Sequence, residues 1–220
     1  MLGTDCHAKD HNRSIGFHNP RYAFGKDEIA IVHVPKTGGT SLHHVLKNCE
    51  NLKVANLLSH RPVSQLCDPR HYEYITILRE PVERVWSYYQ MVLGSEADFP
   101  YKAFAKNLRT FLGRCWEVRN MACRYYSGSV DAEPNATTLG RAMENLKNFS
   151  AVIQFDNFER DVRQVLARRN LSVEAVPHMR KSHYVEMTDE ERRMILEYNE
   201  FDGVLFRAWA RLLSDGAGPA

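Results

Sequence analysis

A loop with two consecutive glycines separates an apolar run from an amphipathic run near the start of the chain. Its residues are Pro35, Lys36, Thr37, Gly38, Gly39, Thr40 and Ser41. The run at 29–34 is rich in β-branched residues and predicts a buried strand, and the run at 41–48 has apolar residues at helical spacing. Glycines let the backbone turn tightly and approach a ligand closely, and Thr40 and Ser41 are expected to cap the helix. Because a helix start attracts anions, the pattern predicts a phosphate-binding loop between strand and helix.

The order of residues in this loop argues against a nucleoside triphosphatase. In the GxxxxGKS or GxxxxGKT loop of those enzymes the lysine follows the glycines, whereas Lys36 precedes them here. A kinase-like enzyme would also carry an aspartate at the end of an apolar strand, but the run at 72–78 is followed by Arg79. The sequence therefore favours a different donor that carries phosphate.

The rest of the chain alternates short β-rich runs with longer helical patterns. Strands are expected at 29–34, within 52–58, at 72–78 and at 151–155. Further helices are expected from Pro81, over 101–146 with breaks at Gly113, Ser127-Gly128 and Glu133-Pro134, after Asn157, after Thr188, and after a turn at Asp202-Gly203. Such alternation predicts an α/β fold, with a P-loop-like, three-layer architecture in which helices flank a central, mostly parallel sheet.

Length and charge restrict the class of protein further. The chain has 220 residues, of which 44% are hydrophobic and 25% charged, and this suits one globular domain. We expect a polar tail or strap at 1–25, a single domain at 26–213 and a disordered tail at 214–220. The formal net charge of +2 is too small a bias for a nucleic-acid-binding protein. No apolar run approaches the roughly 18 residues of a membrane helix, so no integral membrane segment is expected.

A second candidate site follows the expected strand at 72–78. Arg79 stands at the carboxyl end of that strand, where ligands bind in open α/β sheets, and Ser87 lies two turns into the next helix. A guanidinium offers a forked grip on a phosphate, and a hydroxyl adds one more donor. The alternative is a surface ion pair between Arg79 and Glu83 beside a solvated Ser87.

Together, PKTGGTS at 35–41 and LREPxERxxSYY at 78–89 resemble the sulfotransferases that use 3′-phosphoadenosine-5′-phosphosulfate (PAPS). The form is most similar to the carbohydrate or Golgi-type branch, which includes the heparan sulfate 2-O- and 6-O-sulfotransferases and related bacterial enzymes. The resemblance extends over about 29–206. It implies that the residues from Lys36 to Ser41 hold the 5′-phosphosulfate and that Arg79 and Ser87 hold the 3′-phosphate.

A basic loop at 177–183 adds a third point of likeness. It resembles the late loop that closes over the donor in the 2-O-sulfotransferase branch. The resemblance implies that Arg180 and Lys181 reach the 3′-phosphate, and a short basic loop exposed to solvent is the alternative.

The attacking hydroxyl needs a base, and histidine suits that role near neutral pH. His60 follows the second expected strand, and its segment resembles the one that carries the proposed base in the 2-O- and 6-O-enzymes. We therefore expect His60 to be the base, with a surface histidine as the alternative. His33 is expected within the first strand as a packed residue. Glu80 is the second candidate base, although its position beside Arg79 is better suited to an ion pair.

Asn120 and Arg124 resemble a pair found in the family, four residues apart. On a helix two such residues share a face. They either line the acceptor site or make a structural contact.

The predicted reaction moves a sulfuryl group from PAPS to an acceptor hydroxyl, most readily that of a carbohydrate. Lys36 and the loop N–H groups would stabilise charge on the phosphate oxygens while His60 takes the proton. No metal is expected, since the sequence has no acidic cluster suited to magnesium. The alternatives are a nucleotide-dependent, kinase-like phosphotransferase and a non-catalytic nucleotide- or glycan-binding module.

Cysteine usage bears on the compartment. Five cysteines without a CxxC pair indicate free thiols rather than a disulfide framework. This favours the cytoplasm, and the Golgi lumen is the alternative if a targeting segment is missing. The sequence specifies neither the acceptor, a glycan or a small molecule, nor the oligomeric state.

Overall fold

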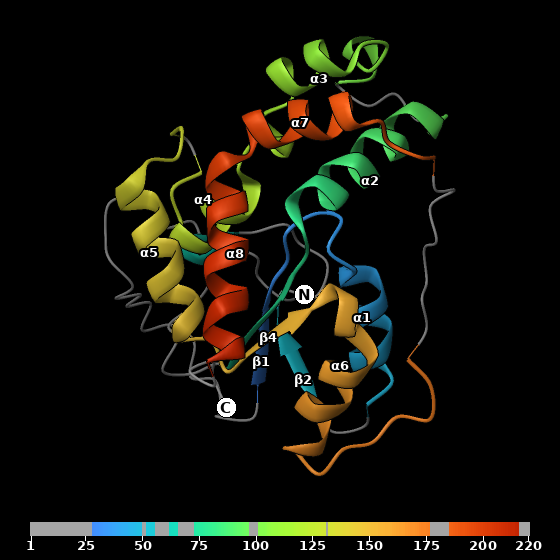
Figure 1. Ribbon diagram of the computed structural model, residues 1–220. Helices are drawn as coiled ribbons and strands as arrows, with labels where there is room; N and C mark the ends of the chain where they lie inside the picture. The colour runs from blue at the N-terminus through green and yellow to red at the C-terminus, as the bar shows by residue number, and fades with distance from the viewer. Residues whose placement is uncertain are drawn as a thin grey trace.

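The computed structural model describes residues 28–49, 52–55, 62–65, 73–96, 101–130, 132–176 and 185–215. Its centre is a sheet of four parallel strands in the order β2-β1-β3-β4 (Figure 1). The strands are β1 (Glu28–Val32), β2 (Lys53–Ala55), β3 (Glu73–Leu78) and β4 (Ala151–Gln154). The expectation of an α/β fold around a parallel sheet is confirmed, and each strand lies within or overlaps its expected run.

Helices pack on both faces of this sheet because successive strand residues point to opposite sides. On one face Ile31 and Ile75 share an apolar cluster with residues of α1 and α6, and on the other Val32 and Leu78 share one with residues of α4, α5 and α8. The first face carries α1 (Gly39–Lys47) and α6 (Phe158–Ala167), and the second carries α4 (Met121–Ser127), α5 (Ala136–Lys147) and α8 (Glu200–Ser214). The two groups lie on opposite sides of the strands in Figure 1.

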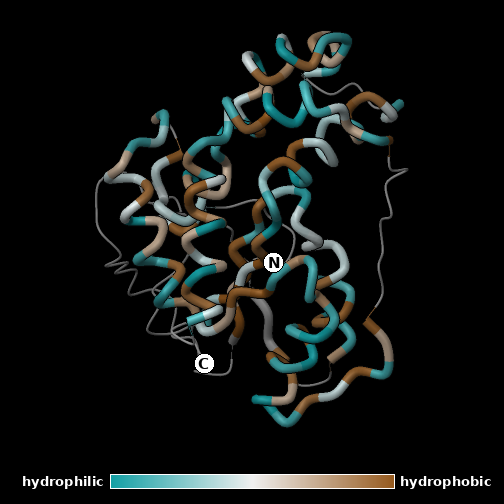
Figure 2. Tube along the Cα trace, viewed as in Figure 1, coloured by the Kyte–Doolittle hydropathy of each residue, from teal (hydrophilic) through white to brown (hydrophobic). Residues whose placement is uncertain are grey.

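A third group of helices extends beyond the carboxyl end of β3 (Figure 1). It consists of α2 (Pro81–Gly94), α3 (Leu108–Arg114) and α7 (Asp189–Tyr198). These helices share a separate apolar cluster that includes Val85, Phe111 and Ile195. Figure 2 shows brown, hydrophobic stretches along the central strands and alternating teal and brown along these helices, the pattern of elements that bury one side only.

Short 3₁₀ turns connect several of these elements. They are η1 (Val63–Gln65), η2 (Lys102–Phe104), η3 (Trp116–Val118) and η4 (Phe155–Asn157). Within the described ranges, no helix is both long enough and apolar enough to cross a bilayer. The tail expected at 1–25 lies outside the described residues, as do 216–220 of the tail expected at 214–220, whose first residue, Ser214, ends α8.

The break expected at Gly113 is off by one residue, because α3 ends at Arg114. The turn expected at Asp202-Gly203 is wrong. Asp202 and Gly203 do not form a turn but lie in the first turn of α8, which begins at Glu200. The Asp202 carboxylate is buried and accepts the backbone N–H groups of Ala122 and Cys123 at 3.0 and 2.8 Å, so it caps α4 from another helix. An Asp-Gly pair by itself favours a turn, but here the tertiary contact with α4 places it in a helix.

Candidate active site

The glycine loop lies at the carboxyl end of β1, the edge of a parallel sheet where ligands bind. Gly38 is the residue before α1 and has a φ of 97°, a left-handed conformation that favours glycine. Its carbonyl accepts the N–H groups of Ser41 and Leu42 at 3.0 and 3.1 Å. The capping role expected for Thr40 and Ser41 is therefore wrong, because the helix has already begun at Gly39 and no side chain caps it. The first turn still presents N–H groups to the loop, as helix starts do.

Position 39 has to be a glycine because a neighbouring side chain leaves no room for a Cβ atom, and not because of its backbone conformation. A Cβ atom at this position would stand 2.0 Å from Nε2 of His33. His33 follows the last residue of β1 and is 7% exposed, so its ring lies beneath the loop. This agrees with its expected role as a packed residue, although it stands just after the strand instead of within it.

A hydrogen bond within the glycine loop and an aromatic ring beside it hold the loop in place. Thr37 donates its hydroxyl to the Val34 carbonyl at 2.8 Å, and it is buried. A Cβ atom at Gly38 would lie 3.2 Å from the ring of Phe155, which follows β4. The Phe155 ring therefore leaves little room for a side chain at position 38.

Lys36 has an unusual backbone and a defined side-chain direction. Its φ of 68° is uncommon for a residue other than glycine. Its Nζ lies 3.6 Å from Sδ of Met91, three turns along α2. The lysine therefore extends from the loop toward α2, the helix that also carries Ser87.

Arg79 joins the two candidate phosphate sites. It follows β3, its Nη1 donates to the Lys36 carbonyl at 3.0 Å, and its guanidinium lies 4.2 Å from the centre of the Phe155 ring. Burial lowers the pKa of Arg79 from its ordinary value, and the carboxylates of Glu83 and Asp156 oppose that shift. No carboxylate of the described residues forms an ion pair with Arg79, and such a half-buried cation is a good place for an anion.

The surface ion pair considered for Arg79 is not formed. Glu83 instead contacts Arg192 of α7 at 3.3 Å, and Ser87 is buried, with 7% exposure, rather than solvated. Glu80 does not pair with Arg79 either. Its carboxylate accepts the Glu83 N–H at 2.8 Å and caps α2, which explains an acidic residue just before a helix that starts with proline.

Three predicted site residues, His60, Arg180 and Lys181, lie outside the described residues. The chain is described again from Val185, four residues after Lys181. The Val185 carbonyl accepts the indole N–H of Trp86 at 2.8 Å. The segment that follows the basic loop is therefore fastened to α2 next to Ser87.

Asn120 and Arg124 are both buried and make structural contacts. The Asn120 N–H donates to Asn199 at 2.9 Å, and its own side chain accepts the Asp202 N–H at 3.1 Å. Arg124 donates to two carbonyls, at 3.0 and 2.8 Å, and pairs with Glu133 at 2.8 Å. Of the two possibilities considered for this pair, these contacts favour the structural one.

The sequence did not assign several residues of this region to the site, namely Phe155, Met91 and the Glu83–Arg192 pair. Phe155 ends the strand expected at 151–155, so its place at the carboxyl edge was a usable signal. Met91 and Arg192 gave no such signal, because only packing brings α2 to the loop and α7 to α2.

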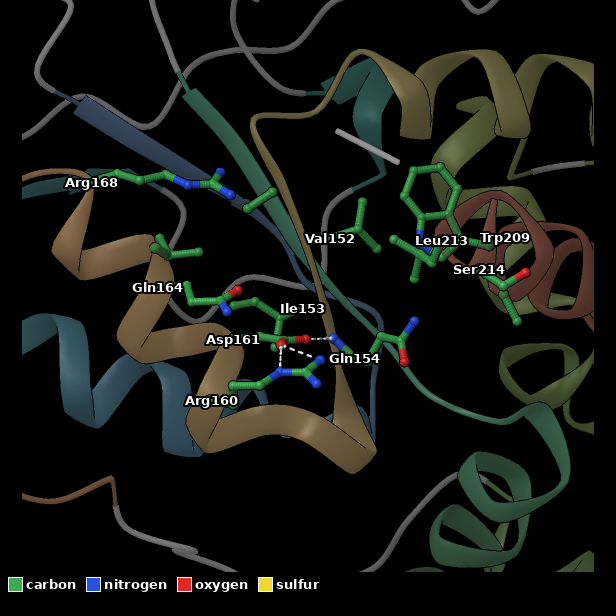
Figure 3. Close-up of a pocket in the computed structure, with 13 residues that line it drawn as sticks. Val152, Ile153, Gln154, Arg160, Asp161, Gln164, Arg168, Trp209, Leu213 and Ser214 are labelled. Carbon is green, nitrogen blue, oxygen red and sulfur yellow. Dashed lines mark hydrogen bonds and ion pairs between the residues drawn. The ribbon is translucent and has the colours of Figure 1, made fainter. Parts of the chain in front are cut away.

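A pocket of 460 Å³ lies elsewhere, beside β4 and between α6 and α8 (Figure 3). None of the residues that line it belongs to the glycine loop or to α2. Asp161 accepts the Gln154 N–H at 2.9 Å there, and Arg168 donates to the Ser150 carbonyl at 3.3 Å. These contacts occupy backbone polar groups at β4, the last strand of the sheet among the described residues, and this limits pairing with other strands.

Comparison with known proteins identifies the family. The model of the sulfotransferase family matches residues 22–207, which include both motifs and most of the chain. The chain therefore belongs to the sulfotransferase family, whose reaction is the transfer of a sulfuryl group. No curated protein matches the sequence.

Proposed function

We propose that this protein is a PAPS-dependent O-sulfotransferase whose donor spans the glycine loop and the start of α2. The observation that carries the proposal is the contact between Arg79 and the Lys36 carbonyl, since it brings both anion-binding groups to one edge of the sheet. A donor with two separated phosphate positions would use both groups at once.

The glycine loop would hold the 5′-phosphosulfate. Backbone N–H groups at the start of α1 suit its oxygens, and Thr37 gives the loop its shape through Val34. Lys36 would leave Met91 and move to the oxygen that bridges phosphorus and sulfur. A cation there stabilises the charge that develops on the leaving group.

Arg79 and Ser87 would hold the 3′-phosphate, with Arg180 and Lys181 as further cations. Arg79 already contacts the loop through Nη1 and has other N–H donors for a phosphate. Ser87 lies on the same helix as Met91, one turn closer to Arg79.

The chemical step would be an in-line displacement at sulfur. The acceptor oxygen bonds to sulfur while the bond between sulfur and the bridging phosphate oxygen breaks, and His60 takes the hydroxyl proton. Adenosine 3′,5′-bisphosphate leaves. Catalysis of this kind depends on positioning and on stabilising charge, as in phosphoryl transfer. A sulfuryl group carries less charge than a phosphoryl group, so the step makes a smaller demand for a bridging metal.

We infer that the acceptor is a carbohydrate hydroxyl, because the two motifs are most similar to those of the carbohydrate branch. The direct test is transfer of labelled sulfate from PAPS to a panel of desulfated polysaccharides, simple sugars and phenols. Calorimetry with adenosine 3′,5′-bisphosphate measures donor-site binding separately. A folded protein that binds neither this nucleotide nor PAPS would overturn the proposal, and transfer only to phenols would overturn the acceptor class alone.

A further inference from the structure

An ion pair joins α7 to the part of α2 that carries Ser87. Arg192, in the first half of α7, places Nη2 3.3 Å from Oε1 of Glu83. The side chains are 44% and 29% exposed, so neither is locked in the interior. The Trp86–Val185 hydrogen bond fastens the chain just before α7 to the same region of α2.

Helix geometry puts Ser87 between this ion pair and Lys36. Residues four apart on a helix are rotated by about 40° and have Cβ atoms about 5–6 Å apart. Ser87 is four residues after Glu83 and four before Met91, whose sulfur contacts Lys36. Arg192 therefore contacts α2 about one turn before Ser87, and Lys36 contacts it about one turn after.

The negative charge of Glu83 close to the proposed phosphate site has to be neutralised, and Arg192 can do this. A carboxylate one turn from a phosphate site repels the phosphate unless a cation neutralises it. Burial lowers the pKa of Arg79, and the Glu83 carboxylate already opposes that shift. Arg192 is in contact with this carboxylate. A guanidinium has five N–H donors in a planar fork, so Arg192 can keep Glu83 and still donate to a phosphate oxygen.

We propose that Arg192 is a donor-binding residue that supplies an additional cation to the 3′-phosphate beside Ser87, with Glu83 holding its guanidinium ready. This inference rests on the proposed function, because it assigns a residue to one phosphate of the proposed donor. The role is binding rather than chemistry, so Arg192 contributes to donor affinity and leaves the transfer step alone.

The competing explanation is an ordinary surface ion pair that ties α7 to α2. Such a pair contributes little to stability and has no preference for one nucleotide over another. The two explanations differ in their dependence on the 3′-phosphate. Adenosine 3′,5′-bisphosphate carries that phosphate, and adenosine 5′-phosphate lacks it but keeps every other part of the nucleotide.

The experiment compares three proteins with these two nucleotides by calorimetry. Arg192→Gln removes the cation, and Arg193→Gln removes the exposed arginine next to it on the same helix as a matched control. We expect Arg192→Gln to weaken adenosine 3′,5′-bisphosphate about tenfold, the effect of one charge-assisted hydrogen bond at a partly exposed site. Its affinity for adenosine 5′-phosphate should stay within about twofold of the wild type, and Arg193→Gln should match the wild type with both.

Each other outcome decides against the inference. Equal weakening of both nucleotides means that Arg192 acts through the fold, and unchanged binding of both means that it forms only the ion pair. The same tenfold loss in Arg193→Gln means that general surface charge is responsible. A wild-type protein that fails to bind adenosine 3′,5′-bisphosphate refutes the proposed function itself, and the inference with it. Thermal melting of each variant verifies that all three proteins are equally folded.

Discussion

Arg79 donates a hydrogen bond to the backbone carbonyl of Lys36, 43 residues earlier in the chain, at 3.0 Å. One side chain thus connects the end of β3 to the loop that follows β1. The Lys36 backbone it holds is left-handed, with a φ of 68°, a conformation that persists only where surrounding contacts support it. Arg79 therefore has a structural task at the loop in addition to its proposed contact with the 3′-phosphate.

This double task predicts how Arg79 variants behave. We expect Arg79→Ala to lower kcat/KM with PAPS by about 10²–10³-fold, and Arg79→Lys to recover little, because an ammonium lacks the planar fork. The variant should also be slower with adenosine 5′-phosphosulfate, a donor without the 3′-phosphate. Labelled transfer assays with both donors measure this. If Arg79→Ala leaves the shorter donor unaffected, the residue serves the 3′-phosphate alone.

Gly39 and His33 form a pair that should tolerate change together but not separately. A methyl group on Gly39 would stand 2.0 Å from the His33 ring, so Gly39→Ala should cost about 1–3 kcal/mol of unfolding free energy. His33→Ala leaves room, and the double variant should be more stable than the sum of the single effects. Urea unfolding of the four proteins gives the coupling directly. Strict additivity would mean that the ring moves aside.

His60 is expected to act in chemistry and not in donor binding. His60→Ala should therefore lower kcat by about 10²–10⁴-fold, the usual contribution of a general base. Calorimetry with adenosine 3′,5′-bisphosphate should give the wild-type affinity. Unchanged turnover with intact binding would assign the proton to another group.

Buried thiols should make the fold sensitive to alkali. Burial raises the pKa of Cys123 from 9.0 to about 12, so the folded thiol stays protonated where the unfolded one ionises. Stability is then complete below the unfolded pKa and declines as the pH rises toward the folded one. This single thiol accounts for a loss of about 1.4 kcal/mol between about pH 8 and about pH 10.

Urea unfolding at these two pH values checks that prediction against Cys123→Ala. The variant is less stable overall, yet its decline with pH should be smaller than that of the wild type. Equal declines would mean that Cys123 is not the group that titrates. Cys115 has the same direction of shift for the same main reason, burial, and supplies a second variant for the same comparison.

The strands and the loop were predictable because their signals are local. A β-rich run, two glycines and an amphipathic run follow one another at 29–48, and each residue type favours its structure without help from distant parts of the chain. The capping box at Thr188 and Glu191 is of the same kind, and both of its hydrogen bonds are formed. The expected helix start at Ser41 was two residues too late, since a left-handed glycine replaced the side-chain cap and the helix begins at Gly39.

Residues whose partners are remote in sequence could not be assigned in this way. Asp202 reads as a turn residue beside Gly203, yet it caps α4 across about 80 positions of the chain. Arg124 lies four residues after Asn120, as in the pair found in the family. Its N–H groups nevertheless donate to two backbone carbonyls and to Glu133. In each case the partner became available only through packing.

The sequence by itself determined the parallel α/β arrangement, the glycine loop at its carboxyl edge and, through two motifs, the family. These depend on periodicity, backbone freedom and residue chemistry within short windows. The tertiary structure decided which groups lie together: Arg79 with the Lys36 carbonyl, Lys36 with Met91, and Arg192 with Glu83, one turn before Ser87. The physical reason is that these contacts join β3, α2 and α7 to elements distant in the chain, and only close packing of the apolar clusters sets those distances.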